Sequence, residues 1–130
     1  MERLPRGACA RIAGLKMGPR RFSEVSLQRL YTCHPKLITL FKMVLGERDC
    51  IILCGFRNET DQNKAFDEGK SKLRWPKGNH NKQPSRAVDV APFPLNWNDE
   101  QSFRDLASIV KQQAACLGIK VNWGGDWHSF

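Results

Sequence analysis

The hydrophobic pattern from residue 23 onward alternates between helical periodicity and short apolar runs. Apolar side chains recur every three or four residues from Val25 to Leu45, and Ser23 before them is of a type that favours a helix N-cap. Pro35 lies inside this segment, and proline is tolerated in the first turn of a helix but not in its interior. The pattern therefore predicts two helices that are separated at Pro35.

Three short runs are typical of strands. They cover residues 50–56, Ala87 to Ala91 and Ile119 to Trp123, and each is either apolar throughout or alternates apolar with polar residues. A third helix is predicted between the first two runs, from Asp61 to Glu68.

A fourth helix is predicted before the last run. Asn98 and Gln101 have the spacing of a capping box, apolar residues follow at helical intervals, and Gly118 is suited to end the helix. The elements do not show the regular strand–helix–strand alternation of a parallel sheet. The expected fold class is therefore α+β, with a small antiparallel sheet packed against helices.

The segment from Gly69 to Ser85 is rich in Lys, Gly, Pro and Asn, which predicts a long surface loop. Long loops in compact domains are often functional. Chemically reactive residues in and around this segment are therefore candidates for a functional site.

Length and charge distribution indicate how the chain is organised. At 130 residues with 41% hydrophobic residues it has the size of one domain. Residues 1–21 contain six basic residues and one acidic residue, together with scattered Gly and Pro, and they show no sustained period. We expect 1–21 to be a flexible basic extension and 22–130 to be the folded domain.

The formal net charge of +8 favours polyanionic partners, which include nucleic acid, anionic lipid and acidic cell-wall polymers. No nucleic-acid-binding motif is present, and no apolar stretch approaches the roughly 18 residues that a membrane span requires. No apolar segment of a secretory signal follows the N-terminus. We therefore expect synthesis in the cytoplasm without a signal peptide, no membrane span and a monomeric protein.

The five cysteines form an odd set without a CxxC pair, so neither a disulfide framework nor a cysteine zinc ribbon is expected. Cys50 and Cys54 are predicted to be small buried residues of the first strand. Both predictions fit a protein made in a reducing compartment.

The chain has three histidines, so few imidazole nitrogens are available to bind a metal. His34 precedes Pro35 at a helix junction, where a structural role is expected. His80 lies in the long loop, and Asp89 interrupts an apolar strand. A buried carboxylate needs a cation, several donors or a metal, unless Asp89 faces solvent on a one-sided strand.

Several motifs together resemble a known family. This family comprises the zinc peptidases of the D-alanyl-D-alanine carboxypeptidase and L-alanyl-D-glutamate endopeptidase type, which includes VanY-like enzymes and many phage endolysins. The likeness extends over residues 22–130, and its most specific part is the block from His80 to Asp89. The motifs are Phe22-Ser23, His34-Pro35-x-Leu37, Cys54-Gly55-Phe56-Arg57 with Gln62, Gly69-Lys70-Ser71-Lys72-Leu73, Trp75-Pro76, His80-Asn81-x-x-Pro84-Ser85-Arg86-Ala87-Val88-Asp89-Val90-Ala91-Pro92 and Trp123-Gly124-Gly125-Asp126-Trp127.

The resemblance implies the fold of these peptidases, which hedgehog proteins share, and a zinc ion (Zn²⁺) as cofactor. His80 and Asp89 are implied as metal ligands, with a zinc-bound water as nucleophile. Arg57 and Gln62 are implied to lie near the bound peptide. Arg57 suits either a developing oxyanion or a substrate carboxylate, because a guanidinium supplies paired donors.

The sequence departs from the family at its end. In relatives an acidic residue and, three residues later, the last His ligand follow the Trp-Gly-Gly-Asp-Trp element, whereas this sequence stops at Phe130. Asp126 and His128 are two residues apart, so in an extended segment they point to the same side, with His128 as third ligand and Asp126 as catalytic residue. The other expectation is that the C-terminal end of the domain is missing.

The resulting functional expectation is a zinc metallopeptidase that cleaves cross-bridges or stem peptides of bacterial peptidoglycan after release from the cytoplasm, as in phage lysis. Both endopeptidase and carboxypeptidase specificity remain open. One rival is a catalytically incompetent module, or truncated remnant, that binds cell-wall peptides. Another is a basic nucleic-acid binder, for which no specific motif is found.

Overall fold

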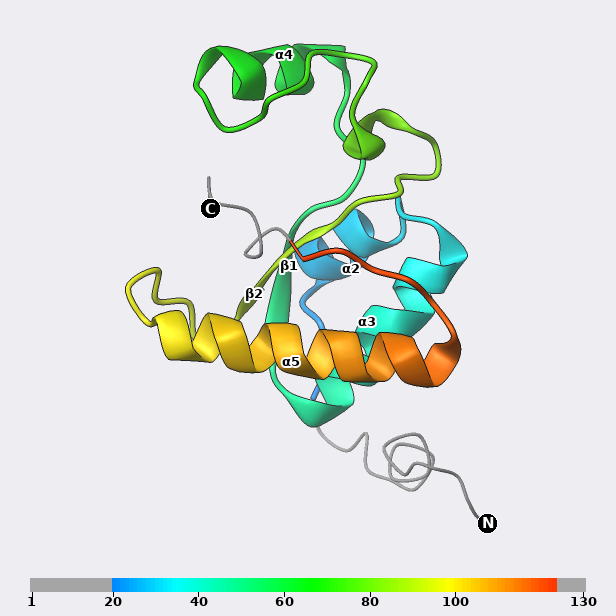
Figure 1. The fold of residues 1–130 in the computed structure, drawn as a ribbon, viewed down its shortest axis with the longest axis vertical. Coiled ribbons are helices and arrows are strands. Elements are labelled where there is room, and N and C mark those ends of the chain that lie inside the picture. Colours follow the sequence, from blue (N-terminus) through cyan, green and yellow to red (C-terminus); the bar gives the residue numbers. More distant parts are fainter. Residues whose placement is uncertain (1–19, 124–130) are drawn as a thin grey trace. The chain divides into compact units, whose positions relative to one another are not determined.

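A computed structural model describes residues 20–123 (Figure 1). Within this range the fold is α+β, with helices and a two-stranded antiparallel sheet, as the sequence predicts. The elements in chain order are α2 (Glu24–Leu30), α3 (Pro35–Glu47), β1 (Cys50–Cys54), α4 (Glu59–Asp67), the short 3-10 helix η1 (Asn79–Asn81), β2 (Asp89–Pro92) and α5 (Glu100–Leu117).

The first two helices begin where the sequence predicts. The Ser23 hydroxyl accepts a hydrogen bond from the backbone N–H of Ser26 at 3.1 Å and so caps α2. Pro35 is the first residue of α3, where its missing N–H costs no helical hydrogen bond. Both predictions are confirmed.

The last two α-helices differ from the prediction at their starts. Helix α4 begins at Glu59, two residues before the predicted start, because the Asn58 side chain caps it. Helix α5 is capped by Asp99 and not by Asn98, since the Asp99 carboxylate accepts hydrogen bonds from the backbone N–H and the hydroxyl of Ser102. Gly118 ends α5 at φ 72°, as predicted.

The sheet is smaller than the sequence predicts. β1 ends at Cys54, β2 begins only at Asp89, and the two strands lie side by side in Figure 1. The prediction of a third strand from Ile119 to Trp123 is wrong, because this segment is neither strand nor helix. Its side chains do alternate between half-buried and exposed. Alternation reports an extended backbone, whereas a strand also needs a hydrogen-bonded neighbour.

The described residues fall into two compact units, and the boundary runs through α3, β1 and β2. The first unit comprises residues 20–21, 39–50 and 92–123. None of the described helices is long and apolar enough to cross a membrane. Most of the buried apolar side chains of the first unit come from α3 and α5. These core residues are Leu40, Phe41, Val44, Leu45, Leu106, Ala107 and Ala114.

The second unit comprises residues 22–38 and 51–91 and holds all the site residues predicted within the described range. Helix α2 is tied to β1 through Ile52, whose backbone N–H donates to the Ser26 hydroxyl and whose carbonyl accepts from Arg29, both at 3.1 Å. Several of its fully or nearly fully buried side chains are polar, including Gln62, Asn81 and Ser85. Buried polar groups need partners, so this unit is held by side-chain hydrogen bonds as well as by apolar packing.

We predict that Gly55 tolerates no side chain. A methyl group there would collide with the carbonyl oxygen of Arg29 and the hydroxyl of Thr32, so the backbone after β1 would have to move. Gly55→Ala should lower the free energy of unfolding by about 2 kcal/mol. Urea denaturation measures this change.

The matched control is Gly69→Ala. Gly69 has a φ of 77° and open space around a would-be methyl group, so only the left-handed backbone opposes alanine, at a cost of about 1 kcal/mol. An equal or smaller destabilisation for Gly55→Ala than for Gly69→Ala would contradict the steric argument.

Candidate metal centre

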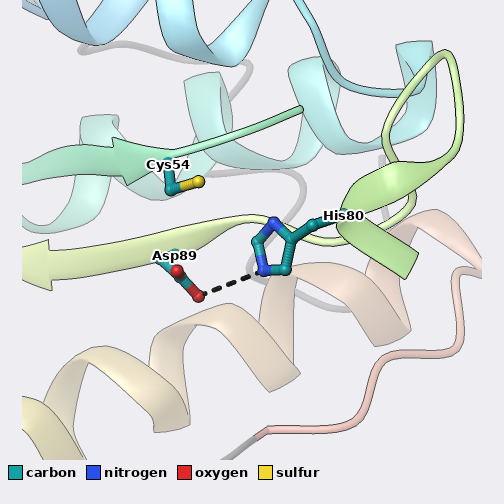
Figure 2. Close-up of side chains that lie close together, drawn as sticks. All are labelled: Cys54, His80 and Asp89. Carbon is teal, nitrogen blue, oxygen red and sulfur yellow. Dashed lines mark ion pairs between the residues drawn. The ribbon is translucent and has the colours of Figure 1, made fainter. Parts of the chain in front are cut away.

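Three side chains with metal-binding atoms converge in the second unit (Figure 2). Cys54 is the last residue of β1, Asp89 is the first residue of β2, and His80 comes from η1. Because the strands run in opposite directions, the end of β1 lies next to the start of β2. The sulfur, a ring nitrogen and a carboxylate oxygen all lie within 4.8 Å of one another.

The His80 ring is oriented by the backbone next to Cys54. Its Nδ1 lies 2.8 Å from the carbonyl oxygen of Gly55, which can only accept, so Nδ1 carries a proton and donates a hydrogen bond to this carbonyl. The other nitrogen, Nε2, faces the Asp89 carboxylate at 3.4 Å. Metal-binding histidines have this arrangement, in which one nitrogen is held by a backbone carbonyl and the other is free for the metal.

The donor set fits a zinc ion. Zinc takes imidazole nitrogen, carboxylate oxygen and thiolate sulfur, usually in a tetrahedral arrangement. With bonds of about 2.0 Å, neighbouring nitrogen and oxygen ligands of a tetrahedral site lie about 3.3 Å apart. The 3.4 Å between His80 Nε2 and Asp89 Oδ1 matches this separation. No other cluster of three or more such donors occurs within residues 20–123.

Arg57 completes the charged environment of Asp89. Its Nη2 lies 3.4 Å from Oδ2 of Asp89, the carboxylate oxygen that does not face His80. The side chains of Arg57 and His80 are 17% and 16% exposed, whereas that of Asp89 is 49% exposed. The carboxylate is therefore open to solvent on one side.

The pKa values of His80, Asp89 and Cys54 are all shifted toward the charged form of the side chain. Burial opposes the charged His80 ring, but contacts with Asp89, Cys54 and the Gly55 carbonyl outweigh it and raise the pKa of His80 to about 9. Burial raises the pKa of Asp89 and that of Cys54, yet His80 and Arg57 lower both below their usual values. Asp89 and Cys54 thus both interact favourably with the positively charged ring of His80. A divalent cation can replace the proton of that ring as their positive partner.

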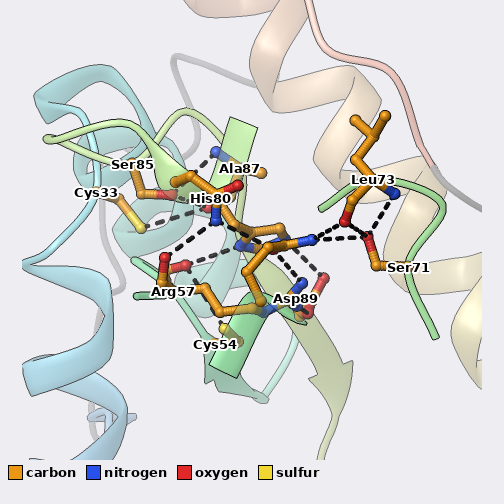
Figure 3. A network of polar contacts seen from close by, with 12 residues as sticks. Cys33, Cys54, Arg57, Ser71, Leu73, His80, Ser85, Ala87 and Asp89 are labelled. Carbon is orange, nitrogen blue, oxygen red and sulfur yellow. Dashed lines mark hydrogen bonds and ion pairs between the residues drawn. The ribbon is translucent and has the colours of Figure 1, made fainter. Parts of the chain in front are cut away.

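A buried amide network positions these residues (Figure 3). The Gln62 carbonyl oxygen accepts hydrogen bonds from Arg57 Nη1 and Asn81 Nδ2, both at 3.0 Å. Its amide nitrogen donates to the Ser71 hydroxyl at 2.8 Å and to the Leu73 carbonyl at 2.5 Å. Gln62 is 1% exposed, and these contacts give both its carbonyl oxygen and its amide nitrogen partners inside the protein.

Asn81 fastens η1 to the segment after β1. Its amide donates to the Arg57 carbonyl at 3.0 Å, and the backbone N–H of Arg57 donates to the His80 carbonyl at 2.8 Å. The Asn81 carbonyl oxygen accepts from the backbone N–H of Gly78 at 2.9 Å. These bonds fix the backbone of His80 independently of any metal.

A second set of bonds places the start of β2. The Ser85 carbonyl accepts from the backbone N–H of His34, and the Ser85 N–H donates to the Thr32 carbonyl, at 2.8 and 2.9 Å. The Ser85 hydroxyl then donates to the Ala87 carbonyl at 2.7 Å, which the Cys33 thiol also approaches (Figure 3). Residues 85–87, just before Asp89, are thus held to the segment between α2 and α3.

Comparison with known proteins identifies the family. The model of the phage L-alanyl-D-glutamate peptidase family matches residues 18–130. The chain belongs to this family. The resemblance drawn from the sequence is thereby confirmed.

Two relatives support the assignment. The chain is 29% identical over 115 residues to the L-alanyl-D-glutamate peptidase of Escherichia phage T5, a match covering 84% of this chain and 82% of that protein. The crystal structure of the L-Ala D-Glu endopeptidase ChiX of Serratia marcescens is similar at a TM-score of 0.73 and 25% identity. That match covers 88% of this chain and 86% of ChiX.

The structure brings together four residues that the sequence singled out, namely Arg57, Gln62, His80 and Asp89. The other two, Asp126 and His128, lie outside the described residues, and their roles stay predictions. His34 lies apart from the cluster, and its Nδ1 accepts from the backbone N–H of Lys36 at 3.1 Å.

Cys54 is the site residue that the sequence interpretation missed. It was expected to be merely a small buried residue, but it is half-buried and borders the cluster. The signal that could have found it is its position directly before the Gly-Phe-Arg motif, at the end of a strand that pairs with the strand of Asp89.

We predict that Gln62→Ala unfolds far more easily than the wild type. The substitution removes one hydrogen bond each from Arg57 Nη1, the Asn81 amide and the Leu73 carbonyl, all at a buried position, which should lower the free energy of unfolding by about 3 kcal/mol. Urea or guanidinium denaturation provides the measurement.

Gln101→Ala is the matched control. Gln101 is exposed on α5 and donates only to Asp105, so its loss should change stability by less than about 0.5 kcal/mol. If the two variants unfold at the same denaturant concentration, the amide network does not hold the site.

Proposed function

We propose that this chain is a zinc-dependent endopeptidase that cleaves the L-alanyl-D-glutamate bond in the stem peptides of bacterial peptidoglycan. The observation that carries the proposal is the orientation of His80, whose Nδ1 is held by the Gly55 carbonyl while Nε2 faces the exposed carboxylate of Asp89. Family membership adds the reaction, because the phage T5 protein and ChiX are named for this bond.

His80 and Asp89 are the proposed zinc ligands within the described residues. When bound, zinc supplies a Lewis acid that polarises the peptide carbonyl and makes water a nucleophile near neutral pH. The chain itself fixes the imidazole through Gly55 and holds the carboxylate through Arg57. His128 as a further ligand and Asp126 as a catalytic residue are carried forward as part of the proposal.

Arg57 is the proposed substrate-facing cation. Its Nη1 donates a hydrogen bond to Gln62 and its Nη2 lies next to Asp89. The guanidinium is therefore fixed beside the carboxylate that we propose as a metal ligand. A fixed guanidinium can bind a carboxylate of the D-glutamate residue or stabilise the oxyanion. Gln62 is buried and fully hydrogen-bonded, and we propose that it contributes to peptide binding by positioning Arg57.

The proposed place of action is the cell wall. The net charge of +8 favours retention on peptidoglycan and its acidic polymers, an attraction that salt would weaken. We propose that the protein is made in the cytoplasm and reaches the wall after release, as expected for a phage lysis enzyme.

The decisive experiment is to incubate the full chain with purified sacculi and to identify the new termini by mass spectrometry. Cleavage of the L-alanyl-D-glutamate bond exposes the amino group of D-glutamate, whereas D-alanyl-D-alanine cleavage releases free D-alanine. We expect new D-glutamate amino groups, their loss after chelation and their return with added zinc. Binding without new termini would instead identify a cell-wall peptide-binding module.

Two matched substitutions test the ligand assignment. Asp89→Asn should lower the hydrolysis rate by at least about 100-fold. Mutating even a residue that only hydrogen-bonds to a metal ligand lowers metal affinity or activity by about 10- to 100-fold. Asp67→Asn is the control, because Asp67 forms an exposed ion pair with Arg74 in the same unit, and its loss should leave the rate unchanged. Equal rates for both variants would exclude Asp89 from the active site.

A further inference from the structure

We infer that the sulfur of Cys54 is a third protein ligand to the metal, so that the described part of this chain supplies a Cys–His–Asp donor set. The inference rests on the proposed metal site and adds a ligand to it. It concerns a residue that the His80 to Asp89 motif does not contain.

The geometry carries the inference. The Cys54 sulfur lies within 4.8 Å of the ligand atoms of both His80 and Asp89. In a tetrahedral zinc site, sulfur and its neighbouring nitrogen or oxygen ligands are about 3.6 Å apart. A change of at most about 1.2 Å, within reach of side-chain rotation at the end of a strand, would bring the sulfur to that distance.

The backbone places Cys54 beside both other members of the cluster. Cys54 directly precedes Gly55, whose carbonyl holds the His80 ring, and β1 pairs with the strand that Asp89 begins. Figure 2 shows the sulfur, the ring and the carboxylate facing a common space. The same short stretch therefore orients one ligand and supplies another.

The other described free thiols have different surroundings. Cys50 is at the opposite end of β1 and is 2% exposed, and Cys33 is 2% exposed with its thiol directed to the carbonyls of Arg29 and Ala87. Cys54 alone among these three is half-buried and borders both an imidazole and a carboxylate. It is the thiol that an entering cation would meet.

A sulfur ligand changes which metals the site prefers. Thiolate is a soft ligand that favours zinc, cadmium and cobalt over magnesium, calcium or manganese. Cys54, His80 and Asp89 leave a tetrahedral metal one position for water or substrate, and with His128 as a fourth ligand the metal would have to expand to five-coordination to bind either. The inferred donor set is therefore compatible with hydrolysis.

Cobalt(II) reports the ligand directly. Added to the metal-free full-length chain, it should give visible d–d bands from its tetrahedral site and a near-ultraviolet thiolate-to-cobalt charge-transfer band. Cys54→Ala and Cys54→Ser should lose the near-ultraviolet band. Cys50→Ala, which removes a thiol from the same strand, should keep it, and circular dichroism confirms that each variant is folded.

Each outcome bears on the inference separately from the peptidase activity. Visible bands without the charge-transfer band in the wild type, or a band that persists in Cys54→Ala, would overturn the sulfur ligand and leave the proposed function standing. A charge-transfer band that depends on Cys54, without hydrolysis of sacculi, would support the ligand and refute the function. Absence of any cobalt binding by the wild type would overturn both the ligand and the zinc dependence.

Discussion

The arrangement of the site depends on two buried amides, those of Gln62 and Asn81. A long segment without regular structure must reach the sheet, and its backbone polar groups need partners where water is excluded. Gln62 binds Arg57, Asn81 and the Leu73 carbonyl at once, and Asn81 binds the Arg57 carbonyl. The loop that carries His80 is thereby fixed to the segment that follows β1.

This constraint explains how three distant parts of the sequence can form one centre. The antiparallel pairing brings the end of β1 next to the start of β2, and the amide network adds η1 to that edge. The Gly55 carbonyl then selects the ring orientation of His80, and Arg57 bridges the network to Asp89. The polar core is thus both the structural and the chemical support of the candidate metal centre.

Local signals in the sequence predicted much of the fold. Ser23, Pro35 and Gly118 act through their own backbone chemistry, so their helix boundaries could be predicted from the residues alone. The segment 119–123 was mistaken for a strand because alternation does not reveal whether a hydrogen-bonding neighbour exists. Cys54 was missed for a related reason, since its closeness to His80 and Asp89 arises from strand pairing and loop docking between distant segments.

The central claim is that His80 and Asp89 hold a metal ion. Elemental analysis of the purified full chain after dialysis against a weak chelator tests it most directly, with His80→Ala and Asp89→Ala measured in parallel and their folding checked by circular dichroism. The account predicts about one zinc ion per wild-type chain and little zinc in either folded variant. A wild-type chain without zinc, or a His80→Ala chain that retains it, would contradict the account.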